Sequence, residues 1–312
     1  MKCIPDMSAP RRVVPGQTWF LTRRTVARFF LLNPDRARVL VGLYWYITAV
    51  IAAKYGIQLH AVQILSTHIH EVVTDPRGEL PKFLRDRNRL FALALKACRG
   101  IDGPVFDGGA PSCVALYGEA AVVKQIAYTL ANCVEAGLAR SPELWVGVTM
   151  SASDIGTRRF EAERPGFFFN PVNPQWPARA HIDITMPPLL ERAFKTAEDA
   201  SACLCGAVDR AVDAAREKVT RSGRSFATPS RIYRTDIRAR ATSPEPERER
   251  NPSFAAGGAR EHKVRAIEDH RSFFEAYRAA FRRLKAGLPD TEFPFGTWRY
   301  CHELGFRMAT AA

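Results

Sequence analysis

The stretch Ile64-Leu65-Ser66-Thr67-His68-Ile69-His70-Glu71-Val72-Val73 places two histidines one residue apart within an apolar run. In a β-strand, side chains two residues apart point to the same side of the sheet. His68 and His70 are therefore expected to stand side by side, with Glu71 on the opposite face. Two neutral imidazoles on one face can bind a divalent cation, but a third ligand must come from elsewhere. His60, on the strand before, is expected to be structural.

The segment Ile126-Ala127-Tyr128-Thr129-Leu130-Ala131-Asn132 is the best candidate for the remaining groups. Within a predicted helix over residues 119–138, Tyr128 and Asn132 are four residues apart and share one face. The amide oxygen of Asn132 suits a hard cation, and Tyr128 presents a phenolic oxygen beside it. Together with the two histidines, these side chains predict a metal-assisted tyrosine nucleophile that could cut a phosphodiester.

The order of these motifs resembles that of the HUH-superfamily tyrosine transposases, in particular the REP-associated tyrosine transposases, relatives of the smallest insertion-sequence transposases. Three further segments agree in order: Val14 to Thr25, Asn132 to Leu138 and Arg140 to Trp145. The resemblance spans residues 11–150. It implies an α+β fold of the HUH nuclease type, with a ferredoxin-like antiparallel sheet covered by helices. It also implies a single Mg²⁺ or Mn²⁺ ion held by His68, His70 and Asn132, and a 5′-phosphotyrosine formed on Tyr128.

The charge of the chain favours an anionic partner. The sequence has 45 basic and 32 acidic residues and a net charge of +13, which is most simply explained by binding to nucleic acid. Arg23 and Arg24, at the end of a predicted strand over residues 17–25, are candidate DNA contacts. So are Lys82, Arg85 and Arg89 on a predicted basic amphipathic helix over residues 80–98. For each of these groups, a solvated surface is the alternative interpretation.

Several other classes of protein lack the residues that they need. The sequence has no Gly-x-x-x-x-Gly-Lys-Ser/Thr phosphate loop, no Cys-x-x-Cys zinc pair and no glycine cluster opening a dinucleotide-binding helix. Seven cysteines and no secretory signal predict a cytoplasmic, nucleoid-associated protein. The most apolar run, residues 39–53, is too short for a membrane span and predicts a buried helix.

The chain is expected to have four parts. Residues 1–150 form the nuclease domain, and residues 151–220 form an accessory α/β segment with a strand over 180–186 and a helix over 188–220. Residues 221–260 are rich in Arg, Ser and Pro and predict a basic linker. Residues 261–312 form a mostly helical C-terminal extension.

The sequence thus predicts a transposase-like, metal-dependent endonuclease and strand transferase acting on single-stranded or hairpin DNA. The alternative is a catalytically silent, repressor-like DNA-binding derivative. It is kept open because Ser66-Thr67 stands where relatives carry Pro-Asn, and Gly103-Pro104-Val105-Phe106 where they carry Gly-x-x-Trp. A replication or conjugation nicking enzyme would share the histidine pair but place its tyrosine differently. Whether Tyr128 acts within one chain or across a homodimer is also left open.

Overall fold

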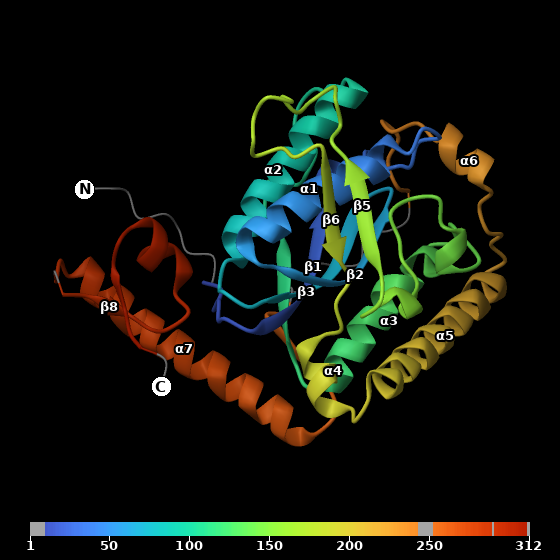
Figure 1. The fold of residues 1–312 in the computed structure, drawn as a ribbon. Coiled ribbons are helices and arrows are strands. Elements are labelled where there is room, and N and C mark those ends of the chain that lie inside the picture. Colours follow the sequence, from blue (N-terminus) through green and yellow to red (C-terminus); the bar gives the residue numbers. More distant parts are fainter. Residues whose placement is uncertain (1–9, 243–251, 289, 311–312) are drawn as a thin grey trace.

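The computed structural model describes residues 10–242, 252–288 and 290–310 (Figure 1). Its principal elements are β1 (Gln17–Arg24), α1 (Val39–Tyr55), β2 (Gln58–Leu65), β3 (His68–Asp75), α2 (Leu80–Arg99), β4 (Ser112–Tyr117), α3 (Glu119–Glu135), β5 (Arg159–Glu163), β6 (Arg179–Asp183), α4 (Pro188–Ala193), α5 (Ala197–Arg221), α6 (Pro229–Arg234), β7 (Phe254–Ala256), α7 (Arg260–Lys285), β8 (Glu292–Phe293) and β9 (Arg307–Met308).

The main sheet has five strands in the order β2-β3-β1-β4-β7. Neighbouring strands among the first four are antiparallel, and these strands are connected as β1-α1-β2-β3-α2-β4. This is the connectivity and strand order of a ferredoxin-like sheet, so the predicted α+β fold is confirmed. The fifth strand, β7, pairs in parallel with β4 and was not expected from the sequence.

The histidines follow a tight turn at the end of the β2–β3 hairpin. Leu65 pairs with His68, so Ser66 and Thr67 alone make the turn. The backbone N–H of Thr25 donates to the Thr67 carbonyl over 2.8 Å, which ties the turn to the end of β1. Because a slip of one residue would move both histidines to the other face, this fixed register is what places them.

The two faces of the sheet have different partners. Helices α1 and α2 cover one face and α3 covers the other, with α5 lying along α3 (Figure 1). On the first face, the Glu71 carboxylate accepts a 2.6 Å hydrogen bond from Tyr44 and forms a buried ion pair with Arg87. On the second, Gln63, the pairing partner of His70, reaches into α3. Glu71 therefore points away from the histidines, as predicted.

The apolar run over residues 39–53 lies in α1, which is buried as expected. The β5–β6 hairpin packs across its outer side, where Trp45 stacks on Phe160 with 3.9 Å between ring centroids. A bilayer-spanning helix, which requires a long and apolar segment, does not occur among the described residues.

The accessory segment differs from the prediction in two places. The strand expected over residues 180–186 is β6, and it pairs with β5, which was not predicted. The single helix expected over residues 188–220 is wrong, because α4 and α5 are separated at Phe194–Thr196. The Thr196 hydroxyl accepts a 3.1 Å hydrogen bond from the Asp199 N–H, which begins a new helix at this point.

Within the linker expected over residues 221–260, the described residues include the short elements α6 and β7. The side chain of Asn33 donates to the Ile232 carbonyl over 2.7 Å, and the Phe30 N–H donates to the Ala239 carbonyl over 3.0 Å. These long-range contacts order the backbone, and composition alone does not reveal them. The Ser-Pro-Glu-Pro-Glu run at 243–247 lies outside the described residues.

The C-terminal extension is mostly helical, as predicted, and has its own small aromatic core. Its buried members are Phe273, Tyr277, Ala280, Phe281 and Phe293. Its helix α7 packs against β7 and β4, and an Arg12–Asp269 ion pair of 3.1 Å joins the extension to the start of the chain. Gly118 marks another close contact, because a Cβ there would lie 2.1 Å from the His262 ring.

Candidate active site

A cavity of about 780 Å³ opens on the α3 face of the sheet. It is lined by β1, β3, α3, the loop before β4 and the segment around β7. Both histidines, the tyrosine and the asparagine that the sequence singled out lie in its wall, together with Arg24. Strand register and helix periodicity therefore bring together the four side chains His68, His70, Tyr128 and Asn132.

Threonine hydroxyls fix both imidazoles. Thr22 on β1 lies 3.0 Å from Nδ1 of His70, and Thr67 lies 2.9 Å from Nδ1 of His68. The two rings are 4.5 Å apart between centroids. Because the hydroxyls occupy Nδ1 of each ring, Nε2 is the nitrogen that remains for a ligand.

Asn132 lies against the first histidine, with its amide nitrogen 3.3 Å from Nε2 of His68. Rotation of the amide by 180° would exchange its nitrogen and oxygen and turn the oxygen toward the same position. The side chain is 7% exposed. Its position is therefore suited either to a hydrogen bond with the neutral imidazole or to sharing a cation with it.

Tyr128 lies one helical turn before Asn132 and beside the second histidine. Its ring is 5.3 Å from the His70 ring and meets it edge-on, and it is 5.9 Å from Phe20. The side chain is 41% exposed, so the phenol is accessible from solvent. The structure brings all of these groups together within one chain.

Burial governs the protonation of the site. Desolvation, with a smaller contribution from Arg24, lowers the pKa of His68 to about 4, and burial lowers the pKa of His70 well below its usual value. Both imidazoles are thus neutral at pH 7 and able to bind a metal. Burial and then Glu135 raise the pKa of Tyr128, whereas Arg24 and Lys218 lower it.

A buried glutamine sets the position of α3 against the histidine strand. The side-chain oxygen of Gln63 accepts a 2.7 Å hydrogen bond from the Cys133 N–H, and its nitrogen donates to the Leu130 carbonyl over 3.0 Å. The residue is 0% exposed. Because it bonds to α3 on both sides of Asn132, Gln63 fixes the separation of the asparagine from the imidazoles.

The two arginines proposed for DNA contact at the end of β1 have different surroundings. The guanidinium of Arg23 donates to the carbonyls of Gly109 and Asp107 and lies over the Phe106 ring. It therefore holds the loop that forms one wall of the cavity. Arg24 is exposed and lines the cavity itself, where its charge can meet a phosphate.

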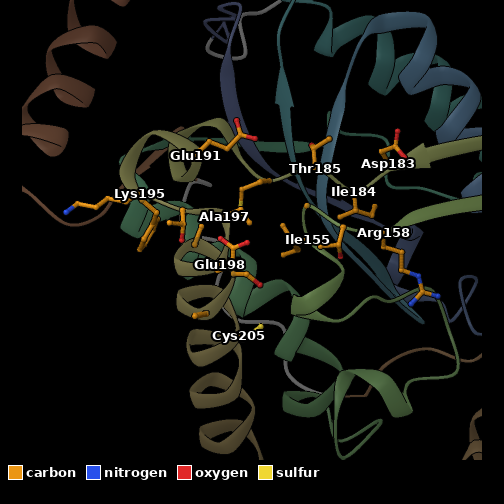
Figure 2. Close-up of a pocket in the computed structure, with 18 residues that line it drawn as sticks. Ile155, Arg158, Asp183, Ile184, Thr185, Glu191, Lys195, Ala197, Glu198 and Cys205 are labelled. Atoms are coloured by element: carbon orange, nitrogen blue, oxygen red, sulfur yellow. The ribbon is translucent and has the colours of Figure 1, made fainter.

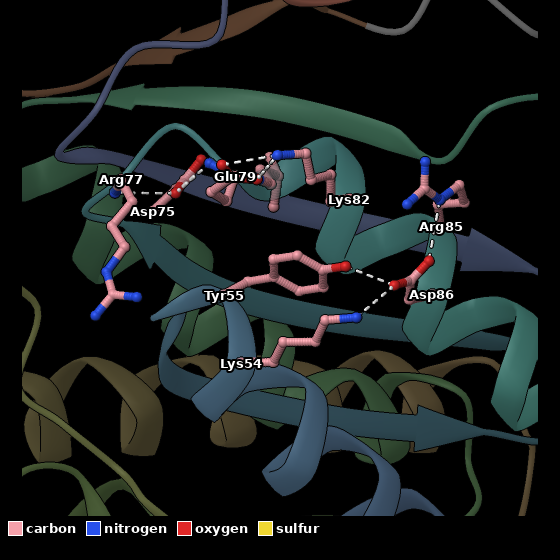
Figure 3. Close-up of polar contacts among 9 residues, drawn as sticks. Lys54, Tyr55, Asp75, Arg77, Glu79, Lys82, Arg85 and Asp86 are labelled. Atoms are coloured by element: carbon pink, nitrogen blue, oxygen red, sulfur yellow. Dashed lines mark hydrogen bonds and ion pairs between the residues drawn. The ribbon is translucent and has the colours of Figure 1, made fainter. Parts of the chain in front are cut away.

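The basic residues of α2 lie on the other side of the sheet from Tyr128. Lys82 forms an ion pair of 2.8 Å with Glu79, and Arg85 forms one of 3.0 Å with Asp86 (Figure 3). Arg89 is exposed. The Asp75 carboxylate begins this helix by accepting from the backbone N–H of Leu80 over 2.8 Å. The structure thus separates these three residues from the four at the centre of the site.

The donor set fits one divalent cation, with two imidazole nitrogens and one amide oxygen leaving coordination positions for phosphate and water. The described residues contain no group of three or more His, Cys, Asp or Glu that could hold a metal. The third protein ligand here would be Asn132, which belongs to none of those types. His60 is structural as predicted, because both of its ring nitrogens are bonded, to the Thr185 carbonyl and the Thr74 hydroxyl at 2.8 Å each.

A second cavity, of about 880 Å³, lies between β6, α4 and α5 (Figure 2). Its wall carries charges of both signs, including Arg158, Asp183, Glu191 and Glu198, and Figure 2 shows Lys195 extending away from it. It contains neither histidine nor tyrosine. The cavity on the α3 face is therefore the candidate active site.

Some residues of the site were missed from the sequence. Phe20 and Thr22 line the cavity. These two residues and Arg24 are spaced two apart, so they share one face of the first predicted strand. This spacing indicates a role in the site only when the strand is known to pair with the histidine strand. Pro252 and Ala255 also line it. No local pattern connects these two residues to a site more than a hundred positions earlier in the chain.

Comparisons with known proteins give two structural similarities. One is to a REP-associated tyrosine transposase bound to a REP hairpin, with 18% identity, a TM-score of 0.36, and coverage of 45% of this chain and 81% of that chain. The other is to a transposase candidate from Deinococcus radiodurans R1, with 20% identity, a TM-score of 0.27, and coverage of 35% and 85%. No family model and no curated protein matches the chain.

Proposed function

We propose that this protein is a transposase-like, metal-dependent endonuclease and strand transferase that acts on single-stranded or hairpin DNA. The observation that carries the proposal is the convergence of His68, His70, Asn132 and Tyr128 on one cavity. Each group alone has an ordinary structural explanation. Two neutral imidazoles, an amide and an accessible phenol in one concave site are the parts that phosphodiester transesterification needs.

His68, His70 and Asn132 would hold a Mg²⁺ or Mn²⁺ ion. When bound, this ion supplies Lewis-acid polarisation of the scissile phosphate and neutralises charge that develops on it. Arg24, exposed at the rim, places a fixed positive charge beside the same phosphate. Thr22 and Thr67 keep the imidazoles oriented, so the protein contributes a site that needs little rearrangement.

Tyr128 is the proposed nucleophile. Its phenolic oxygen bonds to phosphorus as the bond from phosphorus to the 3′-oxygen breaks. The phenolic proton is lost and the departing 3′-oxygen gains one, so the products are a 5′-phosphotyrosine and a free 3′-hydroxyl. Attack by another 3′-hydroxyl reverses the step and joins strands without a nucleotide cofactor.

The test uses a randomised single-stranded oligonucleotide and a hairpin library, each labelled with fluorescein at the 3′ end. With Mn²⁺, a denaturing gel is expected to show labelled protein for the natural sequence and none for Tyr128→Phe. A label at the 5′ end is expected to appear only in a shortened free strand. Tyr117→Phe is the matched control, since Tyr117 does not line the cavity, and it is expected to form adduct normally.

Metal dependence is tested in the same assay. His68→Ala or excess chelator is expected to abolish the adduct while leaving retention of the oligonucleotide in a native gel. A normal adduct in Tyr128→Phe would refute the nucleophile. DNA binding by the natural sequence without any adduct would favour the silent, repressor-like alternative.

A further inference from the structure

A separate cleft of about 520 Å³ lies along α2, on the side of the sheet away from Tyr128. Its wall includes five basic residues and, among the described residues that line it, no acidic one. These basic residues are Arg11, Arg23, Arg85, Arg89 and Lys96. Because like charges are gathered here without lining carboxylates, the cleft is suited to an anion with several charges.

The helix contributes these cations as one stripe. Arg85, Arg89 and Lys96 are separated by four and seven residues, so they share one face of α2. Arg85 and Arg89 are exposed and Lys96 is half-buried. The Arg85–Asp86 ion pair is at the surface, where such a pair contributes little and can be exchanged for a phosphate.

The cleft borders the candidate active site. Arg23, Ala110 and Pro111 line both cavities. Arg23 holds this shared wall by donating to the carbonyls of Gly109 and Asp107, and Arg11 supports it by donating to the Pro111 carbonyl over 2.9 Å. A polyanion that leaves the active site over this wall meets the α2 stripe next.

We propose that the α2 cleft binds the single-stranded DNA that flanks the scissile phosphate. The inference rests on the proposed function. Successive phosphates of one strand would contact Arg89, Arg85 and Lys96. The cleft would thus hold the substrate in place while the chemistry occurs on the other side of the shared wall.

The test measures binding by fluorescence anisotropy, using a labelled single-stranded 30-nucleotide oligonucleotide of mixed sequence. All variants carry Tyr128→Phe so that no covalent product forms. The triple variant Arg85→Gln, Arg89→Gln, Lys96→Gln is expected to bind at least tenfold more weakly. Each phosphate neutralised on a single strand contributes about 0.7 to the slope of log affinity against log salt. Loss of three cations is therefore expected to reduce the magnitude of this slope by about 2. Arg192→Gln, an exposed arginine on α4, is expected to bind like the parent.

Unchanged melting temperature shows that the triple variant is folded. An affinity within twofold of that of the parent, with an unchanged salt slope, would overturn the inference. So would displacement of the oligonucleotide by inorganic polyphosphate of equal charge with equal potency, since the cleft would then be a general anion site. The proposed function is tested separately: it fails if the natural sequence forms no adduct. That result does not change the binding measurement, which tests the α2 cleft alone.

Discussion

At the scale of single residues, a threonine hydroxyl lies against each of the two imidazoles of the candidate site. A neutral histidine can carry its proton on either ring nitrogen. A hydrogen bond at Nδ1 orients the ring and leaves Nε2 facing the cavity. Here the partner at Nδ1 is Thr22 for His70 and Thr67 for His68. Such outer contacts commonly change metal affinity by roughly 10–100-fold when they are removed.

Thr22→Val is therefore expected to weaken Mn²⁺ binding about tenfold, because the side chain keeps its shape but no longer holds the His70 ring. Titration followed by electron paramagnetic resonance of free Mn²⁺ measures this without reference to activity. Thr18→Val, a buried threonine of the same strand that bonds to Thr74, is the control and should bind Mn²⁺ normally. Equal affinity in both variants would contradict a positioning role for Thr22.

His60 predicts how stability depends on pH. Burial lowers its pKa from 6.5 to about 4 in the folded protein, so between these values the unfolded chain binds a proton that the folded protein does not. The contribution of His60 to stability is expected to be fully present above pH 6.5 and to decrease by roughly 3 kcal/mol as the pH approaches 4. His68 and His70, whose pKa values are also lowered, add to the decline. His60→Gln should show a shallower decline in urea unfolding between pH 6.5 and 4. A decline of the same size in His60→Gln would mean that His60 does not contribute to it.

At this scale the sequence predicted the residues of the site but not their supports. His68, His70, Tyr128 and Asn132 follow from periodicity within single elements. Thr22 could not be assigned in the same way, because its role depends on which strand pairs with the histidine strand and in which register. Arg23, expected at a phosphate, bonds instead to loop carbonyls.

At the scale of elements, the important contact is that between β2 and α3. A sheet and a helix that pack only through apolar side chains can shift relative to one another, whereas hydrogen bonds fix one alignment. Gln63 supplies such bonds beside Asn132. The histidine strand and the tyrosine helix are therefore aligned by a polar contact inside the core.

Gln63→Leu is expected to lower the free energy of unfolding by about 1–3 kcal/mol, because the buried Cys133 N–H loses its acceptor. It should also reduce adduct formation more than DNA binding, since Asn132 is no longer held against His68. Urea unfolding and the gel assay measure the two effects. Gln58→Leu on the same strand is the control, because the side-chain oxygen of Gln58 is buried without a partner, and it should be neutral or stabilising.

Elements with strong local signals were predicted well, and those formed by distant contacts were not. The local signals are the apolar run of α1, which ends at Gly56, and the amphipathic periodicity of α2 and α3. The strand β7 has only three residues and exists because the edge of β4 is available to pair with it. The break between α4 and α5 depends on a threonine cap within a sequence that otherwise favours helix.

For the whole molecule, the four side chains of the candidate site lie together within one chain. Tyr128 lies against His70 of its own chain, so no exchange of helices between two copies is needed. The sequence left open whether the tyrosine acts in cis or across a homodimer. The geometry favours action in cis.

Mixing two inactive variants tests this arrangement. His68→Ala retains the tyrosine, and Tyr128→Phe retains the metal ligands. If each site is built from one chain, an equimolar mixture is expected to form no adduct at any protein concentration. Adduct that appears in the mixture and increases with concentration would show that the tyrosine acts on a partner's metal site.

Contacts between distant parts of the chain were the least predictable feature of the whole molecule. The charge of the chain pointed to an anionic partner, but the gathering of Arg11, Arg23 and the α2 cations around one cleft required the fold. Residues 221–242 and 252–260 look like a linker in composition, yet they pack against the ferredoxin-like fold and extend its sheet. A polar and basic composition predicts contact with solvent. The observed contacts depend instead on which surfaces of the folded chain are available for packing.

The most direct measurement of the central claim is anomalous diffraction from crystals soaked in Mn²⁺. One peak is expected in the cavity on the α3 face, within roughly 2–2.5 Å of Nε2 of both His68 and His70 and of the Asn132 amide oxygen. The peak should disappear in His68→Ala. A cavity without a peak at saturating Mn²⁺, or a peak that does not touch both imidazoles, would contradict the account.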